Sequence, residues 1–261
     1  FGADNIVGRL ARFKLIQQMG KDGKTDEAIN ELELLIGETD TKDSAYDNYC
    51  NEMGALFINK KEYAKAETWF QKTIAHLGPQ SLRMPALAHA YYNMGNALIL
   101  QQRYDDAIEY LQKAFKQYQL TFGKEHIDII RTLSLIASAY CRKKDYQKAL
   151  HYYQQEMDMC KHLLDPSDNW IRMTLQNMAY VYEQLGEKEQ STRLTLRAEL
   201  NLNEAVDIAA RFYSLETRAI EYMQNGDPSY AISLFEHFLR SKEYLNEDGA
   251  LLQARALGNI A

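Results

Sequence analysis

The sequence predicts an all-α solenoid of antiparallel helix pairs, because two small-residue positions recur along the chain with one shared period. In the second helix of each pair the small residue is alanine, with one serine, and the spacing is 38 to 42 residues. These positions are Ala28, Ala66, Ala107, Ala149, Ser191 and Ala231. Such a period indicates a repeated supersecondary unit rather than one globular core.

The first helices carry a second series of small residues with the same period. These positions are Gly54, Gly95, Ala137, Ala179 and Ala219. The clearest unit runs from Tyr91 to Phe115, where one apolar helical face is followed by a polar turn and a second apolar face. Neither helix can bury its apolar face alone, so each needs its partner and then a neighbouring pair.

About six units and a terminal helix follow from this period. The units cover 10–36, 44–77, 91–115, 128–164, 170–203 and 209–244, and the terminal helix covers 249–261. In the first unit we expect Leu15 and Met19 to face inward and Gly23 to break the chain between the helices. In the fifth unit the second helix is degenerate, because Lys188, Ser191 and Thr195 replace its large and small apolar residues.

Composition is that of an ordinary folded protein. Of 261 residues, 46% are hydrophobic and 25% are charged. Only 4 Pro and 13 Gly argue against linkers and against an all-β design. We therefore expect one superhelical domain over 1–261. Because the chain begins at Phe1 rather than Met, we also expect it to be part of a longer protein.

Net charge and hydropathy limit the classes of partner that we expect. The net charge is −6 and no long basic run occurs, so direct binding to nucleic acid is not expected. No stretch approaches 18 apolar residues, so no membrane span is expected. The cysteines Cys50, Cys141 and Cys160 lack metal-like spacing and fit small hydrophobes in a reducing, cytoplasmic compartment.

Catalytic motifs are missing from the sequence. It contains no Gly-rich phosphate loop, no nucleophile elbow and no metal-binding helix motif. Glu156, Cys160 and His162 lie close together, but the first two share a helix face and the third points elsewhere. We therefore expect no catalytic residues, no cofactor and no metal.

The residue pattern resembles the tetratricopeptide repeat. The best copy is Tyr91-x-x-Met94-Gly95-x-x-Leu98 followed by Tyr104-x-x-Ala107-x-x-x-Leu111. The period exceeds the usual length of about 34 residues, and with the connector 122–128 it is similar to the kinesin-light-chain type of repeat. Long repeats also occur in bacterial peptide-pheromone receptors of the Rap type. The resemblance implies a right-handed superhelix whose concave face is lined by the first helix of each unit.

That resemblance implies a groove for a protein or an extended peptide. Helical spacing then nominates the residues that face this groove. In the second unit it also places Asn48 and Ala55 on the same helix face as the candidate Asn51. The candidates are Asn51, His89, Tyr92, Asn93, Asn96, Arg131, Ser134, Ser138, Gln176, Asn177 and Tyr180. Amides both donate and accept hydrogen bonds, Arg131 can pair with a carboxylate, and tyrosines supply stiff contact area.

Several alternatives stay open. The polar stripe could be a solvated surface without a partner. The chain could also be a peptide-responsive regulator of the Rap type, or a sensing or scaffolding arm of a larger protein. Asn93 and Asn96 suggest the carboxylate clamp of chaperone-binding relatives, but its lysine positions are not filled. The unpaired terminal helix permits end-to-end self-association.

Overall fold

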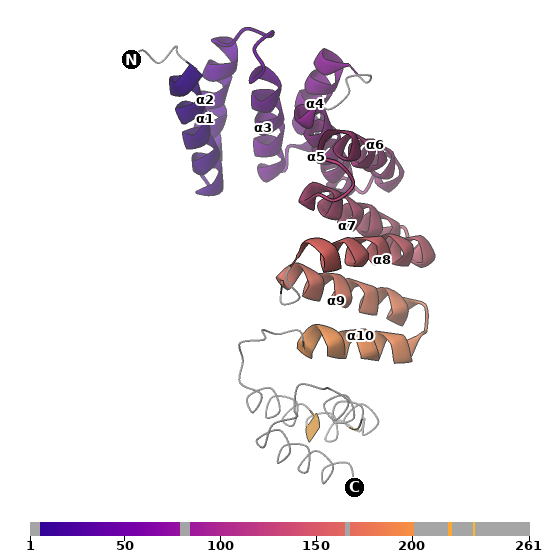
Figure 1. Ribbon diagram of the computed structural model, residues 1–261. Coiled ribbons are helices and arrows are strands. Elements are labelled where there is room, and N and C mark those ends of the chain that lie inside the picture. The colour runs from indigo at the N-terminus through magenta and orange to yellow at the C-terminus, as the bar shows by residue number, and fades with distance from the viewer. Residues whose placement is uncertain (1–5, 79–83, 165–167, 201–218, 221–231, 233–261) are drawn as a thin grey trace. The chain divides into compact units, whose positions relative to one another are not determined.

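The computed structural model describes residues 6–78, 84–164, 168–200, 219–220 and 232. Within these ranges the secondary structure is helical and contains no strand, which confirms the predicted all-α solenoid (Figure 1). The helices are α1 Ile6–Lys21, α2 Thr25–Gly37, α3 Tyr46–Asn59, α4 Tyr63–Leu77, α5 Pro85–Leu100, α6 Tyr104–Phe122, α7 Ile127–Arg142, α8 Tyr146–Leu163, α9 Asn169–Gln184 and α10 Lys188–Leu200.

The chain forms two compact units, residues 1–159 and 160–261. The single domain over 1–261 stays a prediction, since each unit is described by itself. Most of the sixth repeat and the terminal helix lie outside the described residues. Ala219, the small residue of the sixth first helix, is described and is buried.

In the first unit, the first three helix pairs pack internally and then against the helix that follows. The pairs α1–α2, α3–α4 and α5–α6 are in contact, and α2 contacts α3 as α4 contacts α5 and α6 contacts α7. The first helices also contact one another, α1 with α3, α3 with α5 and α5 with α7. Consequently the first helices form a continuous surface of their own, which we call the first-helix face.

The same turn ends each of the five first helices whose ends the structure describes. In each turn one residue has a positive φ, and the next residue donates its N–H to a carbonyl oxygen five positions earlier, as in the Schellman motif. The positive-φ residues are Gly23, Lys61, Gln102, Lys144 and Gly186. Gly23 was expected to break the chain, and it does have a positive φ. In three of the five turns, however, the positive-φ residue is not glycine. The turn is therefore specified by the helix pair and does not require glycine.

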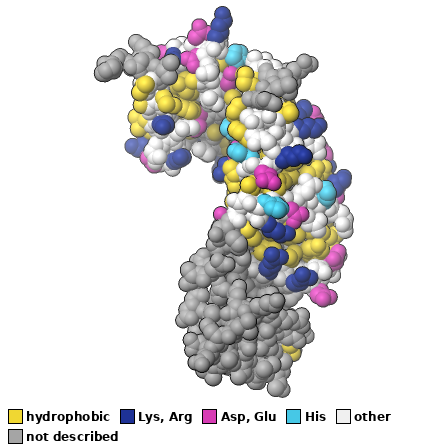
Figure 2. Space-filling model, in the orientation of Figure 1, with side chains coloured by type: hydrophobic (Ala, Val, Ile, Leu, Met, Phe, Trp, Pro, Cys, Tyr) yellow, Lys and Arg dark blue, Asp and Glu magenta, His cyan; other side chains and the backbone are white. Residues whose placement is uncertain are grey.

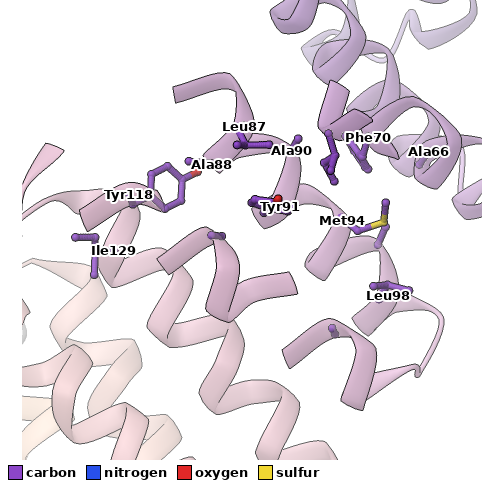
Figure 3. Close-up of a cluster of buried hydrophobic side chains, with 14 of the residues drawn as sticks. Ala66, Phe70, Leu87, Ala88, Ala90, Tyr91, Met94, Leu98, Tyr118 and Ile129 are labelled. Atoms are coloured by element: carbon purple, nitrogen blue, oxygen red, sulfur yellow. The ribbon is translucent and has the colours of Figure 1, made fainter. Parts of the chain in front are cut away.

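Small residues allow close contact between the two helices of a pair. A Cβ added to Gly95 would lie 2.5 Å from Leu111 Cγ, and one added to Gly54 would lie 2.3 Å from Phe70 Cε1. Phe70 is fully buried in a core that α4 shares with α5, α6 and α7 (Figure 3). These contacts explain why small residues recur with the period of the repeat.

One expectation for the first repeat is wrong. Leu15 was predicted to face inward, yet it is 61% exposed, while its neighbour Ile16 is 1% exposed. Ile16 packs in the core of the first two repeats, and adjacent helical residues point about 100° apart, so Leu15 lies outside. Figure 2 shows hydrophobic side chains on the end of the first unit formed by α1 and α2, and Val7 and Leu10 are also exposed there.

In the second unit, α9 and α10 pack against each other. The degenerate residues Ser191 and Thr195 are half-buried, and Thr195 Oγ1 donates to the Ser191 carbonyl oxygen at 3.0 Å. The side chain of Asp168 caps α9 by accepting from the Trp170 N–H at 2.7 Å. The weak apolar pattern of the fifth repeat thus still gives a helix pair.

Candidate functional site

A hollow of about 270 Å³ lies on the first-helix face, between the first helices of the first three repeats. We call it the α1–α5 hollow. It is lined by Phe13 and Gln17 of α1, Asn48, Asn51, Glu52 and Ala55 of α3, and His89 and Asn93 of α5. The structure therefore brings together three predicted site residues, Asn51, His89 and Asn93.

Asn51 holds two helices together, which corrects its predicted role as a free groove amide. Its side chain is only 7% exposed, and Nδ2 donates to the Ala86 carbonyl oxygen of α5 at 2.8 Å. Its Oδ1 is closed off from solvent and accepts no hydrogen bond. Asn51 therefore contributes an unsatisfied acceptor beneath the hollow rather than a donor for a ligand.

Glu52 and Gln17 connect α1 to α3 across the hollow. Gln17 Nε2 donates to Glu52 Oε2 at 2.8 Å. Among the described residues that line the hollow, Glu52 is the only Asp, Glu, Lys or Arg. The repeat pattern predicted neither residue, because it does not show which polar side chains of α1 and α3 contact each other. The i, i+4 spacing of Phe13 and Gln17 was the signal that could have found this face.

Beside the hollow, His89 begins a cluster around Asp128. His89 Nε2 lies 3.9 Å from Asp128 Oδ2, and Arg131 Nη1 donates to Asp128 Oδ1 at 3.1 Å. The Asp128 N–H donates to His126 Nδ1 at 3.3 Å, which caps α7. Burial lowers the pKa of His89, with the Asp128 carboxylate acting in the opposite direction.

Arg131 was expected to pair with the carboxylate of a partner. In the structure it already pairs with Asp128, one turn earlier on the same helix. Its side chain remains 50% exposed, so the pair lies at the surface of the first-helix face. The positive charge predicted for a ligand carboxylate is thus largely balanced by the chain itself.

Aromatic rings form a second layer under this cluster. Tyr92 lies 6.5 Å from the ring of Tyr118, which stacks on Phe122 at 6.1 Å, and Phe122 stacks on His126 at 4.1 Å. Burial raises the pKa of Tyr92, so its hydroxyl stays protonated at neutral pH. The stack gives the first-helix face a rigid support between α5, α6 and α7.

The remaining predicted residues of the first unit are half-buried polar side chains. Asn93 and Asn96 lie on α5, and Ser134 and Ser138 lie on α7. None of these four side chains forms a hydrogen bond with another described residue. Their polar atoms are not closed off from solvent, so these half-buried groups are available to a ligand.

Gln176, Asn177 and Tyr180 lie on α9, in the second unit. All three are exposed, and the exposed fraction of Tyr180 is 50%. Their participation in one groove with the residues of the first unit stays a prediction.

Other features of the described residues bear on function. All three cysteines are free thiols, and burial raises the pKa of Cys50 to about 11, which makes it a poor nucleophile. The described side chains include no group of three or more His, Cys, Asp or Glu able to hold a metal ion. Over the described ranges, none of the helices combines the length and apolar character of a membrane span.

Comparison with known proteins identifies the repeat. A family model for the tetratricopeptide repeat matches residues 86–162 and 128–211. The uncharacterized protein ycf37 of Cyanophora paradoxa is 30% identical over 170 residues, which is 65% of this chain and 87% of that protein. The chain belongs to the tetratricopeptide repeat family.

Solved structures with the same fold support the long repeat. Kinesin light chain repeats from Podosopora anserina are 15% identical at a TM-score of 0.63, over 73% of this chain and 93% of theirs. BtubC from P. vanneervenii is 16% identical at 0.60, over 93% and 92%. The two proteins share the fold with this chain, as expected from its period of 38 to 42 residues.

A third similar structure belongs to a larger protein. It is a signal transduction ATPase with numerous domains and a tetratricopeptide repeat sensor, from Pyrococcus horikoshii. Identity is 15% and the TM-score is 0.69, over 95% of this chain but only 38% of that protein. Tetratricopeptide repeats are protein-interaction scaffolds, so the chain has the architecture of an interaction or scaffolding module.

Proposed function

We propose that the chain is a non-catalytic, cytoplasmic module that binds an extended peptide or protein segment along the first-helix face of its first unit. The observation that carries the proposal is the row of unpaired, half-buried polar side chains on α5 and α7. An extended backbone presents donors and acceptors in alternation, and amide and hydroxyl groups can pair with both. The net charge of −6 favours a protein partner over nucleic acid.

The arrangement of the face supports an extended ligand. The α1–α5 hollow and the Asp128 cluster share His89, so polar groups continue from α1 to α7. Tyr118 of the aromatic stack is 1% exposed, so packing holds its ring in place and limits the conformational entropy that binding must overcome. A peptide lying across the first helices would therefore meet a preformed surface.

The test is a selection of peptides from a random library with the whole chain as bait. Asn96→Ala combined with Ser134→Ala removes two unpaired polar groups from the face, and we expect it to weaken a selected peptide about tenfold. The control combines Gln71→Ala with Gln112→Ala, two exposed amides on α4 and α6. If both double variants bind equally well, the face is not the binding surface.

A second candidate function is a sensing arm of a larger protein. It is favoured by the similarity to the sensor repeats of the Pyrococcus horikoshii ATPase, of which this chain would cover only 38%. Sequencing the full reading frame tests it, because an arm requires an effector domain in the same polypeptide. A regulator of the Rap type stays a prediction, and it would show a change in radius of gyration when a selected peptide is added.

A further inference from the structure

Glu52 differs from the other half-buried carboxylates of the first unit. Each of the others that the structure describes lies within 3.2 Å of a Lys or Arg nitrogen. They are Glu31, Asp43, Glu62, Glu67, Asp128 and Asp145. Glu52 accepts only from the neutral amide of Gln17. Its negative charge is therefore not balanced by a cation among the described residues.

The other described residues that line the hollow with Glu52 include no Lys or Arg. Nδ2 of Asn51 is occupied by the Ala86 carbonyl oxygen, and Oδ1 of Asn51 has no donor. His89 is neutral at neutral pH, since burial lowers its pKa. The hollow thus favours the binding of a positively charged group.

The shape of the hollow suits one long side chain. Its volume of about 270 Å³ falls just below the range of roughly 300 to 1,000 Å³ for small-molecule pockets. Phe13 and Ala55 line it beside the polar groups, and Asn48 at its rim is exposed. An alkyl stem can pack on the apolar residues while its charged end reaches the carboxylate, and an aromatic ring also attracts a cation.

We propose that the α1–α5 hollow binds the basic side chain of a Lys or Arg residue in the partner peptide, with Glu52 as its counter-ion. The proposal rests on the proposed function and specifies the partner's chemistry at one position. Ammonium and guanidinium groups both supply the required charge. A guanidinium group can form two parallel bonds to the carboxylate, so arginine is expected to bind more tightly than lysine.

The experiment is an NMR titration of the whole chain with single-residue probes. The probes are the N-acetyl methylamides of lysine and arginine, and the reference is that of norleucine, which keeps the alkyl stem without the charge. The side-chain amide signals of Gln17, Asn48 and Asn93 report on the hollow. We expect saturable shifts with lysine and arginine, and affinity for norleucine about three- to tenfold lower.

Glu52→Gln tests the counter-ion directly. We expect it to reduce the affinity for the lysine probe to that for norleucine. Glu27→Gln, at an exposed position on α2, changes the net charge equally and should leave binding unchanged. Equal effects of the two substitutions, or equal binding of lysine and norleucine, would overturn the proposal. Added NaCl offers a check without mutation, since it must weaken lysine binding and spare norleucine.

This outcome is separable from that of the proposed function. If selected peptides lack basic residues and depend on Asn96 and Ser134 but not on Glu52, the basic-residue proposal falls while peptide binding stands. If the lysine probe binds through Glu52 but no peptide is selected on the first-helix face, the hollow does bind a basic side chain and the proposed function is wrong.

Discussion

The third and fifth repeats have the same helix pair but bury different amounts of their second helix. In the third, Ala107, Leu111 and Ala114 are fully buried on α6. In the fifth, Ser191 and Thr195 occupy the places of Ala107 and Leu111 and are only half-buried. Both repeats keep the turn with one positive-φ residue. Turn and first helix therefore suffice to form the pair, and the apolar second helix determines how tightly it is held.

The first helices of these two repeats differ in the same direction. The candidate site residues His89, Tyr92, Asn93 and Asn96 of α5 are half-buried, because neighbouring first helices surround them. The corresponding residues of α9 that were predicted as site residues are exposed. Asn93 and Asn177 are the same residue type at the same repeat position, yet the first is half-buried and the second is exposed.

The largest effect should come from truncating the buried contact of the third repeat. We expect Leu111→Ala to destabilise the first unit by about 2 to 5 kcal/mol, because it leaves a cavity beside Gly95. Thr195→Ala, its counterpart, should change stability by less than about 0.5 kcal/mol, since alanine favours the helix and little packing is lost. Hydrogen exchange of the amides in α6 and α10 measures each local stability separately.

The comparison between the repeats would fail if the two substitutions accelerated exchange equally. Such a result would mean that Thr195 is packed as firmly as Leu111. Thr195→Val serves as a control, because it keeps the shape of the side chain and removes the bond to the Ser191 carbonyl oxygen.

A smaller effect is expected from exchanging the turn residues of the two repeats. Gln102 has a φ of 64° and Gly186 a φ of 79°. A side chain in this region costs roughly 1 kcal/mol, so Gln102→Gly should stabilise the third repeat and Gly186→Gln should destabilise the fifth. Urea unfolding with helix-specific exchange measures both changes. Changes of the same sign would show that the turns are not equivalent.

Sequence alone predicted the architecture well because the repeat is set by local rules. Gly54 and Gly95 marked the close helix contacts, and Gly23 marked the first turn. The prediction that Leu15 faces inward was wrong because its large neighbour Ile16 occupies the buried position in α1. A pattern of apolar residues does not fix the rotation of a helix when two adjacent positions are both large and apolar.

The candidate site was harder to predict, because its chemistry depends on partners distant in sequence. The helical pattern nominated Asn51 and Arg131 as site residues, but their bonds to Ala86 and Asp128 follow from packing and capping geometry. Glu52 suggests a site for a cation only because the structure pairs it with the neutral amide of Gln17 and with no described Lys or Arg. Periodicity predicts which side a residue faces, whereas its availability depends on what that side already contacts.

The smallest effect concerns His89, which distinguishes the face of the third repeat from that of the fifth. Burial holds its folded pKa below the unfolded value of about 6.5. The unfolded chain thus binds more protons below that pH, so stability is complete above it and falls as the pH decreases through the interval between the two pKa values. Its side chain is still 43% exposed and faces Asp128, His126 and Arg131, so we expect only a small loss of stability at low pH.

Urea unfolding at a series of pH values should show a weaker acid dependence for His89→Gln than for the unmodified chain. If His89→Gln and the unmodified chain give the same profile, the face around His89 is as solvated as that of α9.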